Sequence, residues 1–479
     1  MMFFFMKYLN KCLTLAFAAV LSGCATTVKE RAGASDEFRS RLVDETRAYF
    51  EANPGRLALA NAFALAHERT LKLTSQELES ELARITRASA FSAFLPNVEA
   101  VYGRYRADGD ATLPPYVRVR DGHGWGDEAA LVATQPVFTP VAWVMFAEST
   151  YGVRIKDLVR ERARELLDVQ VAACFYKAAI AERMVETYRL QLESGVALTN
   201  RVAHLEEEGY AVPAERARAE ARMAADELGL HEAVHSRDKA RSDLSSILSF
   251  WPLAEFSLDG DSILGVTEVP WGFTDTNGVV RTVSRDELER TELAEFVWQG
   301  LLQRKDLFAA DEAVNLRKAQ IVEALAGFLP NIVLGVGGSH TSIESFSMKG
   351  WFGGVTGVWS LFSGFRTVQD YRAARARSEA EFKLREDRML AVVTSVADAW
   401  RNWKETRDRV RAAVKLREAA ALDYADAERR YDDGQETLNR VLDKLTDKDA
   451  AEVRAISAEY AAALAEITLR QALGMKLYE

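Results

Sequence analysis

Two histidines at helical spacing are the residues whose types and arrangement come closest to a catalytic set. His231 and His235 flank Glu232 in the sequence HEAVH. Two His side chains four residues apart share one face of a helix and can bind zinc, while the Glu polarises a water molecule. Glu255 follows His235 by twenty residues, a separation at which some zinc proteases carry a third ligand. The pattern makes a zinc metalloprotease acting through residues 231–235 one hypothesis.

The rest of the chain argues against this chemistry. The corresponding segment of a second, related half of the chain reads ISAEY over residues 456–460 and has no set of zinc ligands. A glycine cluster at 335–338 lacks the Lys and the Ser or Thr of a phosphate-binding loop, and it lies in a predicted strand. We therefore expect no enzyme activity, no catalytic residues, no bound metal and no cofactor.

The start of the chain has the features of an export signal. Lys7 and Lys11 precede an apolar run that is far shorter than the ~20 residues of a membrane-spanning helix. The run ends in LSGC, which resembles a bacterial lipobox; the alternative is an ordinary signal peptide with a chance Cys. The resemblance implies cleavage before Cys24, acylation (palmitate) of that residue and, because Ala25 follows, an outer-membrane destination. Residues 1–23 are then a lipoprotein signal peptide, and residues 24–56 a lipidated N-terminal linker.

Composition narrows the classes of protein further. The chain has 479 residues, a net charge of −10 and three cysteines, Cys12, Cys24 and Cys174. Removal of the signal and acylation of Cys24 leave Cys174 without a partner, so we expect no disulfide. We also expect no nucleic-acid partner, because the chain is acidic and affinity for nucleic acid rests on Lys and Arg neutralising phosphates. No apolar run after the signal is long enough for a transmembrane helix.

Nearly all of the mature sequence is an internal duplication. The motif FLPN occurs at Phe94 and again at Phe328. Three further pairs of landmarks follow in the same order and at a nearly constant separation, namely Phe138 and Phe362, Gly209 and Gly434, and Leu248 and Leu473. A unit of this size is far too long for a solenoid repeat, which has about 20–50 residues. We expect two structural repeats, 57–250 and 286–479, joined by an irregular linker at 251–285.

Each repeat is predicted to begin with a helix and two strands. In the first repeat, apolar residues at helical spacing predict a helix over about 57–94, which Pro96 ends. Strands are predicted at about 98–106 and 129–137, separated by a loop rich in Gly, Pro and Asp. In the second repeat, the helix is predicted over about 292–328, and the strands at about 332–341 and 351–361.

Each repeat is then predicted to continue as a long helical hairpin. Residues 138–208 contain almost no Pro or Gly and carry a heptad seam that Arg162 interrupts. The chain turns near Gly209, and a second helix begins at Pro213, which is tolerated in a first helical turn. The second repeat turns near Gly434 and returns to Leu473.

The lengths of these elements limit what each repeat can do. A helix over 138–208 would be roughly 100 Å long at ~1.5 Å per residue, which is typical of a coiled coil or a helical bundle. Strands of about ten residues match the ~9–11 residues of a tilted membrane-spanning strand. Four strands cannot close a pore, and an open edge in lipid leaves backbone groups unpaired, so several chains would have to share one barrel. The alternative is a small soluble sheet that caps a helical bundle; the lipoprotein start and the long hairpins favour the barrel.

The order of these elements is similar to that of the TolC-like outer-membrane efflux proteins. The similarity extends from about Leu57 to Tyr478. It rests on the duplicated FLPN, on PVF and SLFSG before the long helices, on RRYDDGQETLNRVLD at 429–443, and on ALG near the end. No single motif is distinctive, but their order, spacing and duplication together are.

The resemblance implies a mainly α-helical fold with a small transmembrane β-barrel portion. Three identical chains would share one twelve-stranded barrel, with four strands each, and would build an α-helical tunnel in the periplasm. This homotrimer would bind a periplasmic adaptor (membrane fusion) protein and an inner-membrane pump. The implied function is the passive exit duct of a tripartite efflux or type I secretion system, anchored by lipid in the outer membrane of a Gram-negative bacterium.

The resemblance also implies roles for residues at the two helical turns. Glycine suits a chain reversal because it adopts a positive φ without a steric penalty. The residues implied to meet the adaptor at the periplasmic tips are Gly209, Tyr210, Ala211, Val212, Gly434, Gln435, Glu436, Thr437 and Leu438.

A candidate constriction follows the second turn. Family members can carry acidic residues there, in a ring that closes the tunnel entrance. Asp443 falls at one such position, but Arg440 stands where the best-known family pattern has a second Asp. Three copies of this pair, spaced i, i+3, could close the entrance by mixed charge. The alternative is an ordinary exposed helix pair, which contributes little.

A function without a pore is the main competing hypothesis. A periplasmic coiled-coil scaffold lipoprotein would keep the lipid and the helices, but its strands would not enter the membrane. The zinc metalloprotease is the remote alternative, and it predicts bound zinc and loss of activity on Glu232→Gln.

Overall fold

The structure is a computed structural model that describes residues 28–113, 117–260, 270–343 and 346–477. Its contacts divide the chain into two compact units. One comprises the residues up to Ala62 together with Lys177–Gly260, and the other comprises Phe63–Tyr176 with Asp261–Glu479. No described helix is both long enough and apolar enough to cross a membrane.

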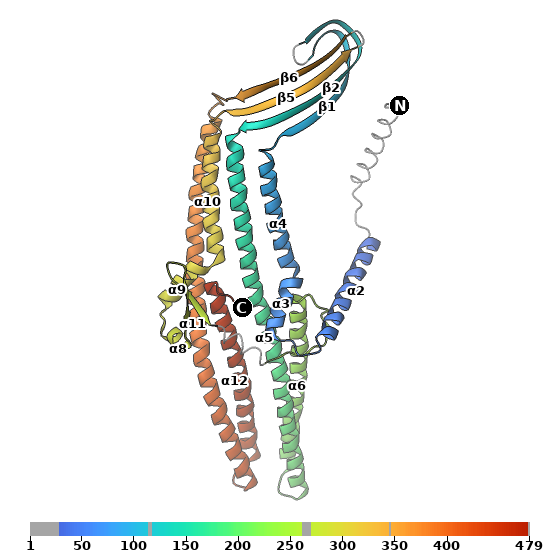
Figure 1. The fold of residues 1–479 in the computed structure, drawn as a ribbon. Coiled ribbons are helices and arrows are strands. Elements are labelled where there is room, and N and C mark those ends of the chain that lie inside the picture. Colours follow the sequence, from blue (N-terminus) through green and yellow to red (C-terminus); the bar gives the residue numbers. More distant parts are fainter. Residues whose placement is uncertain (1–27, 114–116, 261–269, 344–345, 478–479) are drawn as a thin grey trace. The chain divides into compact units, whose positions relative to one another are not determined.

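A four-stranded antiparallel sheet lies in the second unit. Its strands stand side by side in the order β1-β2-β5-β6 (Figure 1), so that one hairpin from each repeat contributes two neighbours. The strands are β1 Asn97–Leu113, β2 Val117–Phe138, β5 Asn331–Ile343 and β6 Phe346–Val358. All three pairs are antiparallel, and β1 and β6 form the edges.

The strands of the first hairpin continue well beyond the predicted 98–106 and 129–137. The predicted loop between them is paired backbone, with Ala107 opposite Gly124 and Thr112 opposite Arg118. Gly and Asp are disfavoured in strands, but continued antiparallel pairing satisfies their backbone groups and overrides that preference. The second hairpin exceeds its predicted start at 332 and ends three residues before the predicted 361.

The helix before each hairpin is divided in two, where one continuous helix was predicted. The first repeat has α3 Leu59–Arg69 and α4 Leu71–Ser92, and the second has α9 Leu293–Gln303 and α10 Lys305–Ala326. The breaks at Thr70 and Arg304 have extended backbones, and each lies at the same distance in sequence before the FLPN motif of its repeat. At Arg304, the break allows close packing: a Cβ on Gly474 would come within 3.0 Å of the Arg304 Cα.

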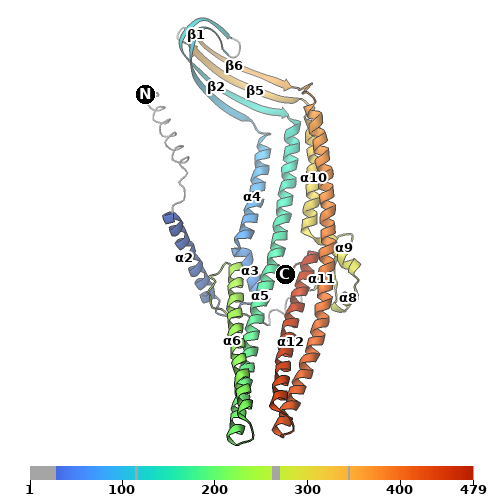
Figure 2. The ribbon, with the colours of Figure 1, turned by 180° about the vertical axis from the view of Figure 1, so that it is seen from behind.

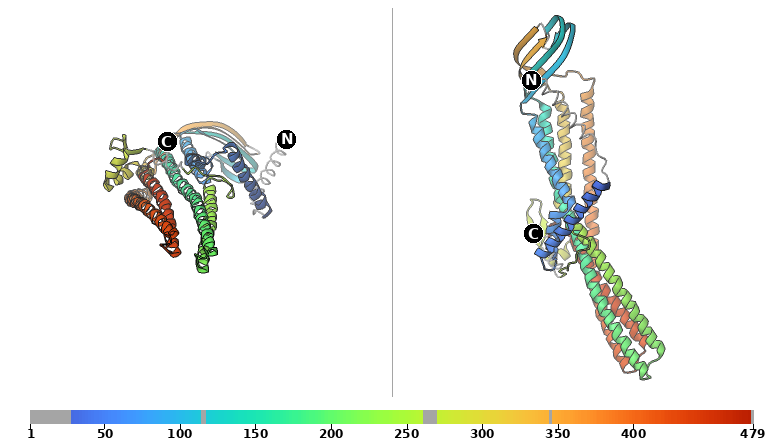
Figure 3. Two further views of the ribbon diagram at one scale, coloured as in Figure 1. Left: turned by 90° about the horizontal axis from the view of Figure 1, so that it is seen from below. Right: turned by 90° about the vertical axis from the view of Figure 1, so that its right-hand side faces the viewer.

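The long helices have the predicted lengths. They are α5 Pro140–Glu207, α6 Pro213–Ile247, α11 Arg366–Asp432 and α12 Leu438–Leu473. In the second unit, α11 and α12 run side by side (Figures 2 and 3). On α11, Val396 and Trp403 are seven residues apart and both are buried, as expected of a heptad seam.

The predicted irregular linker at 251–285 is partly ordered. Its described part includes a hairpin of β3 Trp271–Thr274 and β4 Val280–Val283, and the short helix α8 Arg285–Arg290 follows. Trp271 and Phe273 lie on one face of β3 and are buried against Phe296 and Trp403. Two alternating aromatic residues were enough to order strands of only four residues, because they complete the core of the second unit.

The predicted N-terminal linker at 24–56 is mostly helical. Helix α2 occupies Val28–Ala52, a stretch without Pro and with Gly33 alone as a helix-weakening residue. In the first unit, Tyr49 and Phe50 at its end contact Phe250, and Phe50 stacks on Phe256. These aromatic contacts supply burial to a helix whose other side chains are largely exposed. The signal peptide and Cys24 lie outside the described residues.

Candidate functional site

The first helical turn, after α5, is closed by a Schellman motif. Gly209 has φ +85°, its N–H donates to Glu206 O at 3.0 Å, and the Tyr210 N–H donates to Leu205 O at 2.7 Å. The Tyr210 side chain is 81% exposed, and Val212 is also exposed. The turn therefore presents an aromatic ring and an apolar side chain to the surroundings of the first unit.

The second turn, after α11, repeats this geometry. Gly434 has φ +72°, and the Gln435 N–H donates to Arg430 O at 2.8 Å. Gln435 and Thr437 are exposed, whereas Leu438 is only 1% exposed and is held within the hairpin. Of the predicted contact residues at this turn, Leu438 is therefore the one whose side chain serves the hairpin's own packing.

The candidate constriction residues lie on the exposed side of α12. Arg440 and Asp443 are both exposed, and no ion pair joins them among the described residues. The neighbouring Lys444 instead binds Asp423 of α11 at 2.9 Å. The hydrogen bond and charge of Lys444, with help from Arg440, hold the pKa of the Asp423 carboxyl below its usual value. Asp423 and Lys444 thus tie the hairpin together, and Arg440 and Asp443 remain directed outward.

The HEAVH motif does not build a metal site. His231, Glu232 and His235 are exposed on α6, and Glu255 is exposed in the segment after it. Among the described residues, no cluster of three or more His, Cys, Asp or Glu side chains could hold a metal ion. Two His and a Glu are the residue types of a zinc protease, but no third ligand joins them in the part of the chain that the structure describes.

The sheet has two chemically different faces. Cross-strand partners define one face, called the apolar face, that is apolar near the strand ends next to the helices and charged farther along. Its apolar side chains include Val98, Ala100, Tyr102, Leu131, Ala133, Leu334, Val336, Trp351 and Val355, and its described titratable side chains include Arg104, Arg106, Asp127, His340 and Lys349. On it, Trp351 is 87% exposed and Val355 68% exposed. The opposite face mixes apolar residues with small and polar ones, including Glu99, Glu128, Ser339, Thr341 and Thr356.

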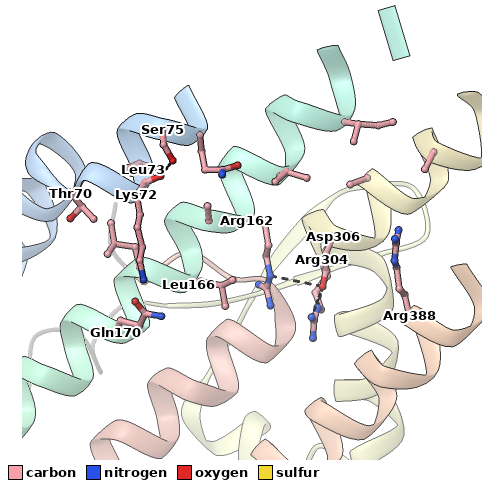
Figure 4. Close-up of a pocket in the computed structure, with 17 residues that line it drawn as sticks. Thr70, Lys72, Leu73, Ser75, Arg162, Leu166, Gln170, Arg304, Asp306 and Arg388 are labelled. Atoms are coloured by element: carbon pink, nitrogen blue, oxygen red, sulfur yellow. Dashed lines mark hydrogen bonds and ion pairs between the residues drawn. The ribbon is translucent and has the colours of Figure 1, made fainter. Parts of the chain in front are cut away.

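A charged pocket in the second unit was not predicted. Its volume is about 890 Å³, and it is lined by residues of α4, α5, α10 and α11 together with both helix breaks, Thr70 and Arg304 (Figure 4). Arg304 makes a bidentate pair with Asp306, at 3.0 and 2.5 Å, and donates to Ser395 Oγ at 2.9 Å. The equivalent breaks of the two repeats thus line one pocket.

Arg162 connects this pocket to the packed helices. It is 8% exposed, binds Glu165 at 2.6 Å, donates to the Gln471 carbonyl at 3.3 Å, and lies 4.0 Å from Asp306. Burial raises the pKa of the Asp306 carboxyl, but Arg304 and Arg162 outweigh that effect and hold the pKa below its usual value. The sequence signal for this site was the polar residue that interrupts the heptad seam.

Comparison with known proteins identifies the class to which this architecture belongs. Residues 298–475 match the outer membrane efflux protein family. The fold matches crystal structures of outer-membrane channels. The TM-score is 0.70 for CusC, at 16% identity over 88% of this chain and 92% of that chain. For the open state of the Neisseria gonorrhoeae MtrE channel it is 0.68, at 20% identity over 88% and 89%.

A curated relative supports the same class. The cation efflux system protein CusC of Escherichia coli K12 is 27% identical over 203 residues. The matched segment covers 40% of this chain and 44% of CusC, so it spans less than half of the relative. Residues 298–475 thus match the outer membrane efflux protein family, and the described chain has the fold of outer-membrane channels.

Proposed function

We propose that the protein is the outer-membrane exit duct of a tripartite efflux or type I secretion system. One observation carries the proposal: a curved, two-faced, four-stranded sheet with both edges open is continuous with helices of 68 and 67 residues. The sheet would enter the outer membrane, and the helices would form a passive conduit in the periplasm. The energy for transport would come from an inner-membrane pump.

The two faces of the sheet suit opposite solvents. Transmembrane barrels alternate apolar residues toward lipid with polar or small residues toward the lumen. The part of the face with Leu131, Trp351 and Val355 suits lipid, and the charged residues of that face, which include Arg104 and Lys349, lie farther along the strands from the helices. The face with Glu99, Glu128 and several glycines suits a water-filled lumen, because the charges stay hydrated there. A scaffold with no membrane contact would have no use for 87% exposure of Trp351.

The open edges argue for three copies of the chain. An unpaired strand edge is not tolerated in lipid, because its N–H and C=O groups have no partners there. Pairing β6 of one copy with β1 of the next would remove both edges, and three copies would give the twelve strands that the family resemblance implies. Exposed Leu71, Leu78, Leu82 and Ile85 form a stripe on α4 that a neighbouring copy would cover.

The turns at Gly209 and Gly434 would be the periplasmic tips. In this proposal, Tyr210, Val212, Gln435 and Thr437 meet a periplasmic adaptor protein, since their side chains are available to a partner. Arg440 and Asp443 would line the entrance as three copies each. Within one chain, these two residues form no ion pair with each other. The arrangement of the charged ring would therefore depend on contacts between copies.

Lipid at Cys24 would add a second attachment to the outer membrane. The lipobox-like LSGC supports it, and α2 would then connect the acylated residue to the rest of the chain.

The name of CusC assigns cation efflux to that protein. For this chain, the acidic lumen face favours cations over anions among the solutes that pass.

Removal of the lipid separates this proposal from the scaffold lipoprotein. We expect Cys24→Ser, exported with an ordinary signal peptide, to stay in the outer-membrane fraction after an alkaline carbonate wash, because the barrel holds it there. A scaffold would be released into the soluble fraction by the same change. Wild-type protein serves as the control, and quantitative release of the variant as folded protein would contradict the duct.

A further inference from the structure

The apolar face of the sheet contains a groove with a polar rim. Its volume is about 570 Å³, and it spans all four strands. Gly338 forms part of the floor, and its missing side chain lets the Trp351 ring lie against the strand, since a Cβ there would come within 3.3 Å of that ring. Tyr102, Leu131 and Trp351 form apolar walls. The groove can accept a hydrocarbon chain of a lipid.

The rim of the groove is cationic. The strand register places Tyr102, Ala129, His340 and Lys349 in one row across the sheet. Lys349 is exposed and has no ion pair among the described residues, and His340 Nδ1 is buried with no hydrogen-bond partner among them. These two groups can contact an anion that is seated at the end of the groove.

The next row of the sheet adds further positive charge. Arg104 stands over the Trp125 ring at 5.2 Å and lies 3.7 Å from Asp127, which also accepts from the Tyr102 hydroxyl at 2.8 Å. Arg106, opposite Trp125 in the register, is exposed. Asp127 is the one acidic residue among the described side chains of this face near the rim. A chain with a net charge of −10 thus concentrates positive charge here.

The position along the strands identifies the leaflet. His340 lies nine residues from the start of β5 at Asn331, which is about 30 Å along the strand at 3.4 Å per residue, or roughly 22–25 Å of height at a strand tilt of about 35–45°. A barrel has an apolar band about 25 Å tall between its two aromatic girdles. The strand ends near Asn331 adjoin the helices, so the rim lies at the opposite, outer boundary of the apolar band.

We infer that this groove binds a phosphorylated lipid of the outer leaflet, with an acyl chain against Gly338 and Trp351 and a phosphate at Lys349 and His340. Charge complementarity carries the choice of occupant, because a phosphate offers strong acceptors for charge-assisted hydrogen bonds. The inference rests on the proposed function, which places this face of the sheet in lipid.

The test is a titration of the detergent-purified full-length trimer with bisphosphorylated lipid A, followed by native mass spectrometry. We expect saturable binding of one lipid per chain. Lipid A from which the phosphates have been removed should bind about tenfold more weakly. The double variant Lys349→Gln with His340→Gln should lose affinity for the phosphorylated lipid to a similar extent. Lys349→Arg should retain it, and Lys383→Gln, an exposed charge on α11, is the matched control.

Conductance in planar bilayers distinguishes the two ways in which the idea can fail. A conducting trimer that binds phosphorylated and dephosphorylated lipid equally, or whose double variant binds as the wild type does, overturns the lipid site and leaves the duct intact. A protein that forms no trimer and no channel overturns both. Conductance of the double variant equal to that of the wild type, with weakened lipid binding, supports the site.

Discussion

A positive φ at one glycine reverses each long hairpin. A Cβ at Gly209 or Gly434 would meet no atom within 4 Å, so the conformation itself, rather than space, requires glycine. A non-glycine residue in the left-handed region costs roughly 1–2 kcal/mol. The same two residues were identifiable from the sequence, because a glycine that interrupts a long helical pattern at equivalent places in two repeats has few other uses.

Substitution of these glycines should destabilise the hairpins by a predictable amount. We expect Gly209→Ala and Gly434→Ala each to lower the free energy of unfolding by about 1 kcal/mol per chain. Gly152→Ala is the control, since Gly152 lies inside α5 with free space around it. Alanine there should stabilise by up to about 1 kcal/mol. Thermal unfolding in detergent measures all three, and equal effects at the three positions would contradict the assigned turn geometry.

Breaking a buried ion pair beside the core of the second unit should lower the free energy of unfolding more than the glycine substitutions do. Arg470 is 1% exposed, binds Glu466 at 3.1 Å, and stacks on Trp271 at 4.3 Å, while Glu466 also accepts from Arg285 at 2.8 Å. Glu466→Gln removes the countercharge and leaves the arginine buried, which should cost about 3 kcal/mol or more.

The exposed pair Lys383–Glu386, at 2.7 Å, is the matched comparison. Glu386→Gln should change the free energy of unfolding by less than about 1 kcal/mol. Chemical denaturation of the two variants measures the difference. A Glu466→Gln variant as stable as Glu386→Gln would mean that Arg470 is solvated in the assembled protein.

At the scale of elements, the contact of α5 with α10 contains a carboxylate pair. Burial, and after it the charge and hydrogen bond of Glu323, raise the pKa of Glu148 to about 7, against the smaller lowering effects of Gln320 and Arg317. A raised carboxyl pKa means that the folded protein holds the proton more tightly than the unfolded chain does. The pair therefore favours the folded state below about pH 4.5, and that contribution is lost as the pH rises toward 7.

The raised pKa of Glu148 predicts a pH-dependent contact between α5 and α10. We expect the midpoint of thermal unfolding to fall between about pH 5 and pH 7 in the wild type, and to fall less in Glu148→Gln, whose side chain cannot lose a proton. Glu386→Gln should follow the wild type. Parallel curves for the wild type and Glu148→Gln over this range would exclude Glu148 as the source.

Comparison of the elements with the sequence shows which parts of the fold local sequence patterns predict. The heptad seam over 138–208 predicted a long helix, and Gly209, Gly434 and the Pro of each FLPN predicted helix ends, since those features are local. The paired backbone over 107–113 and 117–126 was not predictable from Gly and Asp content, because its order comes from the partner strand. The pocket was missed for the same reason: Arg162 and the Gln471 carbonyl are 309 residues apart in sequence.

At the scale of the whole molecule, three chains should form one cation-preferring pore. Glu99 and Glu128 are the charged residues among the described side chains of the mixed sheet face, so the proposed lumen is acidic. We expect a reversal potential in a KCl gradient that indicates K⁺ preference over Cl⁻. Glu99→Gln with Glu128→Gln should reduce the preference, whereas Lys349→Gln on the other face should not. Preference for anions in the wild type would contradict the assignment of the two faces.

The central claim is that trimers of this chain are ducts with an entrance lined by Arg440 and Asp443. Single-channel recording in planar bilayers, with protein purified from outer membranes, tests it most directly. The account predicts discrete conductance steps in the wild type that are altered by Asp443→Ala or by Arg440→Ala. Steps that neither substitution changes would mean that other residues line the entrance. A folded protein that stays monomeric and never conducts would contradict the duct itself.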